Sequence, residues 1–153
     1  MFFAPLEAWR HVKVTERRTL QDFAQCLRDL VDLHFPQAQK IVLVMDHLNT
    51  HKLASLYQAF EPAEARRIIE KLELHHSPKH GSWLNMAEID SILQRQCLKA
   101  RIPDPETLAD KLHAWQTHRN AQAAKLHWQF TTEDARIKLH SLAIFPDWKK
   151  NER

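Results

Sequence analysis

The feature that most constrains the fold is a run of five apolar residues, Ile41 to Met45, between Lys40 and Asp46. The run is too short for an independent helix, and it lacks the alternation of a strand with one face in water. It is typical of a central strand that is buried on both faces, in a sheet that helices cover. Ligands of such sheets bind at the carboxyl ends of the strands.

Asp46 stands at that carboxyl end. A carboxylate buried there alone costs free energy, so a cation, a metal ion or several hydrogen-bond donors should accompany it. The same residue can instead cap the next helix, which is a common role for aspartate after a strand. The apolar run by itself does not separate these two interpretations.

The segments around this strand predict an α/β fold with a mixed sheet flanked by helices. Short strands are expected within residues 1–6, 9–14 and 72–75. Amphipathic patterns and capping residues predict helices that begin at Thr19 and at the pair Asp104-Pro105. Further helices are expected at residues 50–60, 62–70, 82 to about 99, and from 131 or 132 onward.

Length and composition exclude several classes of protein. The 153 residues suffice for one domain that buries roughly 70% of its unfolded surface, and we expect it to span residues 1–145, followed by a polar tail at 146–153. The single glycine, Gly81, excludes the glycine-rich phosphate loops of dinucleotide-binding and P-loop proteins. A net charge of +3 permits nucleic-acid binding. The sequence predicts no membrane segment, and its two lone cysteines fit a reducing cytoplasm.

A second carboxylate of interest lies on the helix expected after Ser82. Glu88 falls at the edge of the apolar stripe of that helix, beside Asn85, Ile92 and Arg95. Asp46 and Glu88 are the type of pair that holds a divalent metal ion through oxygen ligands. The alternative is that Glu88 is exposed and pairs with Arg95 or Lys99, and periodicity alone leaves both interpretations open.

Two blocks of sequence are more specific than this pattern. Residues 42–52 and 76–89 resemble the second and third acidic blocks of DDE transposases, and the second block holds Ser-Pro-x-x-x-x-Trp-Leu-Asn-x-x-Glu from Ser77 to Glu88. The similarity is greatest to the bacterial insertion-sequence branch related to mariner elements. It extends over residues 3–6, 10–15, 119–120, 128–131 and 134–136, and so spans nearly the whole chain.

The resemblance implies an RNase H-like fold with three catalytic carboxylates, two aspartates on neighbouring strands and a glutamate on a later helix. These carboxylates hold two Mg²⁺ or Mn²⁺ ions for DNA cleavage and strand transfer. Asp46 matches the second aspartate and Glu88 the glutamate, so both are expected to be catalytic metal ligands. One departure is His47, where asparagine is common in this branch.

The resemblance also places the first aspartate on a strand that would precede Met1, so we expect the first strand of the sheet to be absent from these residues. The chain then corresponds to the carboxyl-terminal portion of a transposase and has little activity alone. The alternative function is a non-catalytic remnant that binds DNA or associates with intact transposase. Expected partners are transposon-end and target DNA, a second copy or a fuller-length transposase, in the bacterial cytoplasm at the nucleoid.

Further residues acquire expected roles from the matched blocks and their charge. Asn49, His51 and Trp83 are expected to support the site, with Trp83 packing rather than stacking on bases. Asn85 either orients Glu88 or caps its helix, and Lys79 either contacts phosphate or faces water. The expected DNA-contacting residues are Lys79, His80, Asn85, Arg95 and Arg119.

Overall fold

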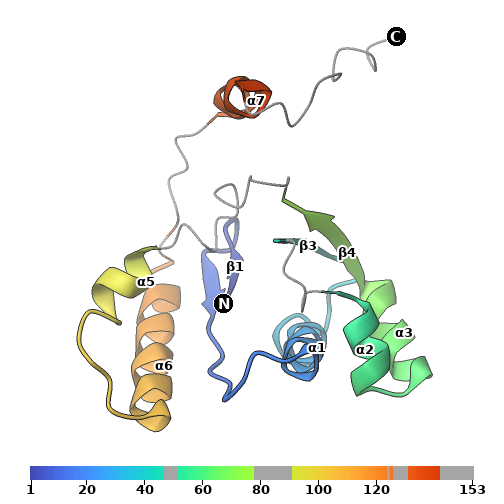
Figure 1. The fold of residues 1–153 in the computed structure, drawn as a ribbon, viewed down its shortest axis with the longest axis horizontal. Coiled ribbons are helices and arrows are strands. Elements are labelled where there is room, and N and C mark those ends of the chain that lie inside the picture. The colour runs from blue at the N-terminus through green and yellow to red at the C-terminus, as the bar shows by residue number, and fades with distance from the viewer. Residues whose placement is uncertain (47–51, 78–90, 124, 126–130, 142–153) are drawn as a thin grey trace.

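The computed structural model describes residues 1–46, 52–77, 91–123, 125 and 131–141. Its helices and strands follow one another in a mixed order, as expected from the sequence (Figure 1). They are β1 (Phe2–Ala4), β2 (Trp9–His11), α1 (Leu20–Asp29), the π-helix η1 (Leu30–His34), β3 (Ile41–Met45), α2 (Ala54–Ala59), α3 (Pro62–Lys71), β4 (Leu72–His76), α5 (Ser91–Gln96), α6 (Pro105–Ala121) and α7 (Thr132–Ser141).

The described strands form two separate two-stranded sheets. β1 and β2 are antiparallel, with Phe3 opposite Arg10, and β3 and β4 are parallel, with Met45 beside His76. The turn between β1 and β2 includes Ala8, which is buried and has a φ of 54°. The mixed α/β character predicted from the sequence is therefore confirmed, although the strands do not form one continuous sheet within the described residues.

Helix α1 begins where the sequence predicts and is fixed by its first residues. The Thr19 side chain accepts a hydrogen bond from the Asp22 N–H, and the Asp22 carboxylate accepts one from the Thr19 N–H, which together form a capping box. The Thr19 hydroxyl also donates to the Asp22 carboxylate, and this bond, together with the one from the Thr19 N–H, lowers the pKa of Asp22. The helix continues into η1, where the Phe35 N–H donates to the Leu30 carbonyl at 3.0 Å, and Pro36 follows the end of η1.

The main core lies between α1–η1 and the β3–β4 sheet. Its completely buried members include Leu27 and Val31 from α1–η1, Leu56 from α2 and Ile68 from α3. Ile41 and Leu43 of β3 pack against this cluster. Burial of such large apolar side chains contributes roughly 1.5–3 kcal/mol each, so this cluster is the main source of stability near β3.

The prediction that β3 is buried on both faces is wrong. Its residues alternate, with Ile41 and Leu43 in the core, whereas the Val42 and Val44 side chains are 62% and 55% exposed. Successive strand residues point to opposite faces of a sheet, so the valines lie on the face that the α1 core does not cover. The apolar run could not reveal this, because one uncovered apolar face leaves no trace in composition.

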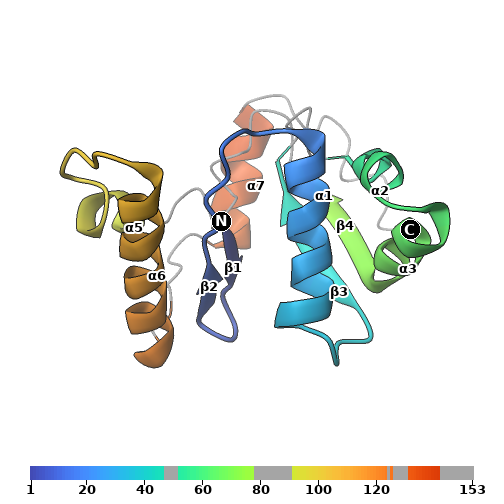
Figure 2. The same ribbon diagram turned by 90° about the horizontal axis from the view of Figure 1, so that it is seen from below.

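The β1–β2 sheet packs against the other side of α1–η1. The Trp9 ring lies 5.0 Å from both the His34 and Phe35 rings, and the His11 ring lies 4.2 Å from that of His34, measured between ring centroids. Lys13 forms an ion pair with Asp29. One continuous helical segment therefore supports both sheets, and Figure 2 shows α1 lying across the space between them.

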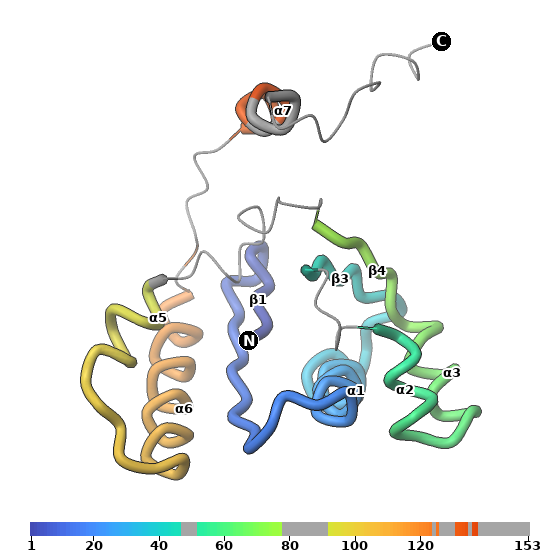
Figure 3. Tube along the Cα trace, in the orientation of Figure 1, coloured from blue at the N-terminus to red at the C-terminus, as the bar shows by residue number. Residues whose placement is uncertain are grey.

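Helix α6 covers the outer side of β2. Asp104 caps it by accepting from the Thr107 N–H, Pro105 opens it, and Leu112 and Trp115 are buried, all as predicted. The Trp115 indole N–H donates to the Gln96 side chain of α5 at 3.0 Å, which joins the two helices. The Cα trace in Figure 3 shows α5 and α6 beside the β1–β2 sheet and α2 and α3 beside the β3–β4 sheet.

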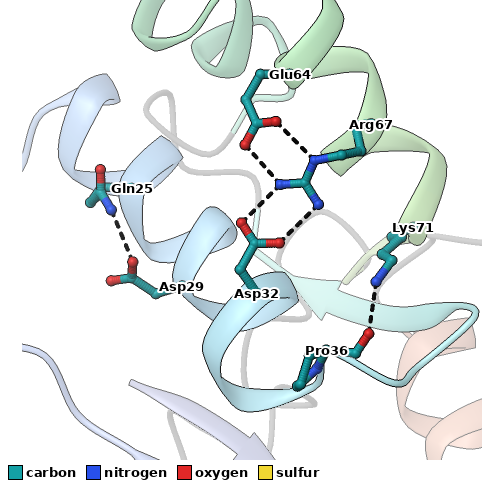
Figure 4. Close-up of polar contacts among 7 residues, drawn as sticks. All are labelled: Gln25, Asp29, Asp32, Pro36, Glu64, Arg67 and Lys71. Atoms are coloured by element: carbon teal, nitrogen blue, oxygen red, sulfur yellow. Dashed lines mark hydrogen bonds and ion pairs between the residues drawn. The ribbon is translucent and has the colours of Figure 1, made fainter.

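A network of charged side chains joins η1 to α3 (Figure 4). The Arg67 guanidinium donates two hydrogen bonds of 2.8 Å to the Asp32 carboxylate and bonds the Glu64 carboxylate on its other side. Close to it, the Lys71 ammonium donates to the Pro36 carbonyl at 3.0 Å. The carboxylates raise the pKa of Arg67, and Arg67 lowers that of Glu64. The network holds α3 against the end of η1.

For the remaining helices, the predicted positions agree with the structure better than the predicted lengths do. Pro62 is at the first position of α3, and α7 begins at Thr132, both as predicted. The helix expected to reach about residue 99 ends at Gln96, and its predicted beginning at Ser82 lies outside the described residues.

Candidate active site at the ends of β3 and β4

Asp46 follows the last residue of β3, at the carboxyl end predicted from the sequence. β4 is parallel to β3, so its own carboxyl end lies at the same edge of the sheet. The Ser77 N–H donates to the Met45 carbonyl at 2.9 Å, and this bond extends the pairing by one residue beyond β4. Asp46 therefore stands beside His76 and Ser77.

Burial changes sharply across this edge. Met45 and Ser77 are 6% and 4% exposed, whereas Asp46 is half-buried and His76 is exposed. The backbone that carries Asp46 is thus anchored in the core, while its carboxylate lies at the boundary with solvent. A carboxylate on such a fixed backbone loses little conformational entropy when it binds a ligand.

The alternative role of Asp46 as the cap of the next described helix is not observed. The N-cap position of α2 is occupied by Leu53, which makes no side-chain capping hydrogen bond. Asp46 lies seven positions before it. The ligand-binding role of Asp46 stays a prediction.

Most of the other predicted site residues lie outside the described residues. Glu88, the second predicted carboxylate, is among them, so its position relative to Asp46 stays a prediction. His47 lies outside the described residues as well. The remaining residues of this group are Asn49, His51, Lys79, His80, Trp83 and Asn85.

Arg95 and Arg119, two predicted DNA contacts, are described. Arg95 is exposed on α5, and Arg119 is half-buried in the last turn of α6, with its Nε atom buried and without a hydrogen-bond partner. Both helices lie on the β2 side of the molecule, whereas Asp46 follows β3 (Figure 1). The two arginines are therefore not gathered around Asp46.

Sequence reasoning missed His76 and Ser77 as neighbours of Asp46. The signal was present, because the segment 72–75 was predicted to be a strand and the carboxyl ends of parallel strands meet at one edge. Only the pairing of β4 with β3, in this direction and register, places these residues there. His76 can offer an imidazole and Ser77 a hydroxyl to a polar ligand.

A second polar region lies between β2, η1 and α6, in a cleft of about 370 Å³ lined by His11, Lys13, Asp29, His34 and His113. Burial lowers the pKa of both His11 and His34, and the charge of Lys13 lowers each further. Lys13 is paired with Asp29. The burial that lowers these pKa values disfavours a positive charge on His11 and His34, and Asp29 compensates the charge of Lys13, so this cleft is a poor DNA-binding site.

A metal site is not complete within the described residues. The described ranges contain no group of three or more His, Cys, Asp or Glu side chains suited to a metal ion. Asp46 supplies oxygen atoms of the kind that Mg²⁺ and Mn²⁺ prefer, but one carboxylate does not make a site. A metal ion held by Asp46 would need further ligands from residues outside these ranges.

Comparison with known proteins adds a finding that geometry alone does not provide. Residues 1–109 match the family described as DDE superfamily endonuclease. This match covers most of the chain and includes Asp46, β4 and the position of Glu88. No curated protein and no solved structure matches the chain. None of the described helices is both long enough and apolar enough to span a membrane.

Proposed function

Because this chain belongs to the family of DDE superfamily endonucleases, we propose that it is the catalytic part of a transposase. The proposed activity is metal-dependent DNA cleavage and strand transfer in the transposition of an insertion sequence of the mariner-related bacterial branch. The proposed fold is RNase H-like, with the strands of both sheets belonging to one larger sheet. DNA of the transposon ends and of the target is the proposed substrate.

The position of Asp46 carries this proposal. It follows a strand whose core face is packed on α1, and it lies where two parallel strands end together. Catalysis of phosphoryl transfer depends on holding charged ligands in fixed positions, since a displacement of about 1 Å reduces the rate severely. The anchored end of β3 provides such a position.

Asp46 and Glu88 are the proposed ligands of Mg²⁺ or Mn²⁺. Such ions, when bound, stabilise the charge of the scissile phosphate and the attacking and leaving oxygen atoms. The chain supplies carboxylate oxygens for the ions and, in this proposal, phosphate contacts from Lys79, His80, Asn85, Arg95 and Arg119. Asn49, His51 and Trp83 support the two carboxylates.

A third carboxylate is required beside Asp46 and Glu88, and the resemblance assigns it to no residue of this chain. Two carboxylates hold two divalent ions poorly, because each ion needs several oxygen ligands to compensate for lost water. The isolated chain is accordingly expected to bind metal weakly and to cleave DNA slowly.

Metal binding and DNA nicking together test the proposal. Mn²⁺ binding would be measured by electron paramagnetic resonance, and nicking of supercoiled plasmid with Mg²⁺ or Mn²⁺ by gel electrophoresis. Asp46→Asn and Glu88→Gln should each reduce Mn²⁺ affinity by about tenfold or more, because each removes a charged ligand. Any nicking should disappear in both variants.

Glu73→Gln is the matched control, because Glu73 is an exposed carboxylate on β4 that pairs with His75. It should leave Mn²⁺ affinity unchanged. If Asp46→Asn and Glu73→Gln have the same small effect in folded protein, Asp46 is not a metal ligand. The chain would then be a non-catalytic remnant, for which binding to intact transposase is the relevant assay.

A further inference from the structure

A second cleft adjoins the one that lies between β2, η1 and α6. It has a volume of about 660 Å³ and is lined by residues 14–16, which follow β2, and by residues from 102 to 109, which lead into α6 and form its beginning. Figure 3 shows the beginning of α6 and the segment between β2 and α1 at the same end of the molecule. Val14 and Ala109 line both clefts, so the two form one continuous groove, which we call the α6 groove.

The lining of the α6 groove is largely apolar and is partly open to water. Val14, Ile102 and Leu108 are each half-buried in it. Leu33 of η1 lines the end of the groove near β2, and its side chain is 71% exposed. Apolar side chains of a ligand would remove these surfaces from water, which is the main favourable contribution to most protein association.

The charge of the groove is opposite in sign to that of the whole chain, which is +3. Among the described residues that line it, Lys13 is the only lysine or arginine, and the acidic residues are Glu16, Asp29, Asp104 and Glu106. Asp29 is paired with Lys13, which leaves the other three carboxylates in excess. The lining therefore repels the phosphates of DNA and attracts cationic groups.

Two of these carboxylates have no structural role among the described residues. Asp104 caps α6, whereas Glu16 and Glu106 are exposed and form no ion pair with any residue that the structure describes. Arg17 and Arg18 follow Glu16 in the sequence but do not line the groove. Glu16 and Glu106 lie on different walls of the groove, one before α1 and the other in the first turn of α6.

We propose that the α6 groove binds a short extended segment of a partner protein in which apolar residues alternate with lysine or arginine. Successive residues of an extended segment direct their side chains to opposite sides. Alternation therefore turns the apolar side chains to the lining at Leu33 and Leu108 and the basic ones to Glu16 and Glu106. The two clefts, of about 370 and 660 Å³, have the volumes of ordinary ligand sites.

A fluorescently labelled peptide, Lys-Leu-Lys-Phe-Arg-Leu-Lys, is a suitable probe of the full chain. Its binding would be measured by fluorescence anisotropy and located by NMR, in which the amide resonances of Val14, Ala109 and His113 should shift. The affinity should fall by about tenfold when the NaCl concentration is raised from about 0.05 M to about 0.5 M, because salt screens the attraction to Glu16 and Glu106.

Two control peptides separate docking in the groove from general attraction of cations to acidic groups. The first replaces leucine and phenylalanine by serine and keeps every charge, and the second keeps the apolar residues and replaces lysine and arginine by glutamate. Each should bind at least about tenfold more weakly than the probe, since each removes one of the two kinds of contact. Equal binding of the serine peptide would overturn the proposal.

Ala109→Gln tests the groove directly. Ala109 is exposed on α6 and lines both clefts, so a larger side chain there would fill the place where they join. Glutamine is a good helix former, and the variant should fold normally, as circular dichroism would show. The probe should bind it about tenfold more weakly or worse.

Ala114→Gln is the matched control, because Ala114 is exposed on the same helix and does not line the groove. It should bind the probe as the unmodified chain does. If folded Ala109→Gln also bound the probe normally, the groove would not be the binding site.

Glu106→Gln tests the contribution of charge and should weaken binding of the probe by about threefold, as expected for one partly exposed ion pair. Asp110→Asn removes a carboxylate from the same helix outside the groove and should have a smaller effect. Equal weakening by the two variants would show that the whole acidic surface of α6 attracts the peptide, and would contradict the proposal.

The NMR map also separates this proposal from other occupants and from the proposed nuclease activity. Shifts at Met45, Asp46 and Ser77 in place of the groove, or equal shifts of the groove resonances by duplex DNA, would overturn it. The same holds if a second copy of the chain occupies the groove, so that binding of the probe weakens as the protein dimerises. Ala109→Gln should leave Mn²⁺ affinity unchanged, so failure at the groove is distinguishable from failure at Asp46.

Discussion

Three strand edges of the molecule can be compared: the edge of β2 away from β1, the edge of β1 away from β2, and the edge of β3 away from β4. We call the first the outer edge and the other two the inner edges. All expose backbone N–H and C=O groups, which must find partners in protein or water. At β2, Asn120 and Gln116 of α6 provide these partners from more than a hundred residues away. Among the described residues, no strand pairs with the edge of β1 away from β2 or with the edge of β3 away from β4.

This difference teaches that the described fold protects its edges selectively. The outer edge of β2 lies beside α6, which carries two amide side chains four positions apart. Gln116 and Asn120 are neighbours on one face of the helix, so both can reach the backbone of β2. The open edges lie on both sides of α1. The following experiments test the contrast between the two kinds of edge.

The largest expected effect is on hydrogen exchange in the unmodified chain. The Arg10 amide should exchange about a thousandfold more slowly than the Val42 and Val44 amides, which corresponds to roughly 4 kcal/mol of protection. Arg10 is 1% exposed and its N–H is bonded, whereas the valine amides point to an unpaired edge. Exchange would be measured by NMR. Equal exchange rates for the Arg10 amide and the two valine amides would show that the two kinds of edge do not differ.

The next effect is the cost of opening the closed edge. Asn120→Ala removes two hydrogen bonds from the backbone of a buried residue and should lower the free energy of unfolding by about 2–4 kcal/mol. Gln116→Ala removes one bond at a less buried residue and should cost about 1 kcal/mol. Urea denaturation would measure both.

Thr117→Ala is the control, because Thr117 is exposed on the same helix. It should change stability by less than about 0.5 kcal/mol. If Asn120→Ala were as mild as Thr117→Ala, α6 would not be closing the edge.

A smaller effect is expected from acid on the packing of β2 against η1. The pKa values of His11 and His34 lie below their ordinary value of 6.5 because both rings are partly buried. The unfolded chain therefore takes up protons first as the pH falls, so stability is complete above 6.5 and declines below it, toward the lowered pKa values. Urea midpoints at several pH values would show this decline.

The variant His11→Gln/His34→Gln should be less sensitive to acid over the same range. His75→Gln is the control, since His75 is exposed on β4 and its ring pairs with Glu73. A decline of equal size in the double variant would assign the acid sensitivity to other groups.

The smallest effect should come from the charged network of Figure 4, which joins η1 to α3. Arg67→Ala removes bonds to Asp32 and Glu64, and the ion pairs are partly exposed, so it should cost about 1 kcal/mol or less. The cost should diminish at high salt. Hydrogen exchange at Val42 and Val44 should not change, whereas a change there would show that the network also stabilises the open edge.

Much of the local structure was predictable because its causes are local. The Thr19 capping box, the Asp104 cap with Pro105, and the end of β3 before Asp46 all depend on residues within a few positions of one another. The family was recognisable for a similar reason, since its match includes two short blocks around Asp46 and Glu88.

The features that sequence reasoning missed depend on distant pairs. Val42 and Val44 are exposed because no described element covers their face of the sheet, and the apolar run contains no information on that. His76 and Ser77 join Asp46 only through the parallel pairing of β4 with β3. The hydrogen bond between Asn120 and Arg10 joins residues 110 positions apart, and the hydrophobic periodicity of α6 does not predict it.

The π-helix η1 has a consequence for how one helical segment supports both sheets. Its bond from Phe35 to Leu30 encloses one residue more than an α-helical turn, so η1 resembles a single-residue insertion into an ordinary helix. Deleting one residue there would let the α-helical ladder continue and would rotate every later side chain by about 100°. His34 and Phe35 would then turn away from Trp9. The helix would still pack against the β3–β4 sheet but would lose its contacts with the β1–β2 sheet.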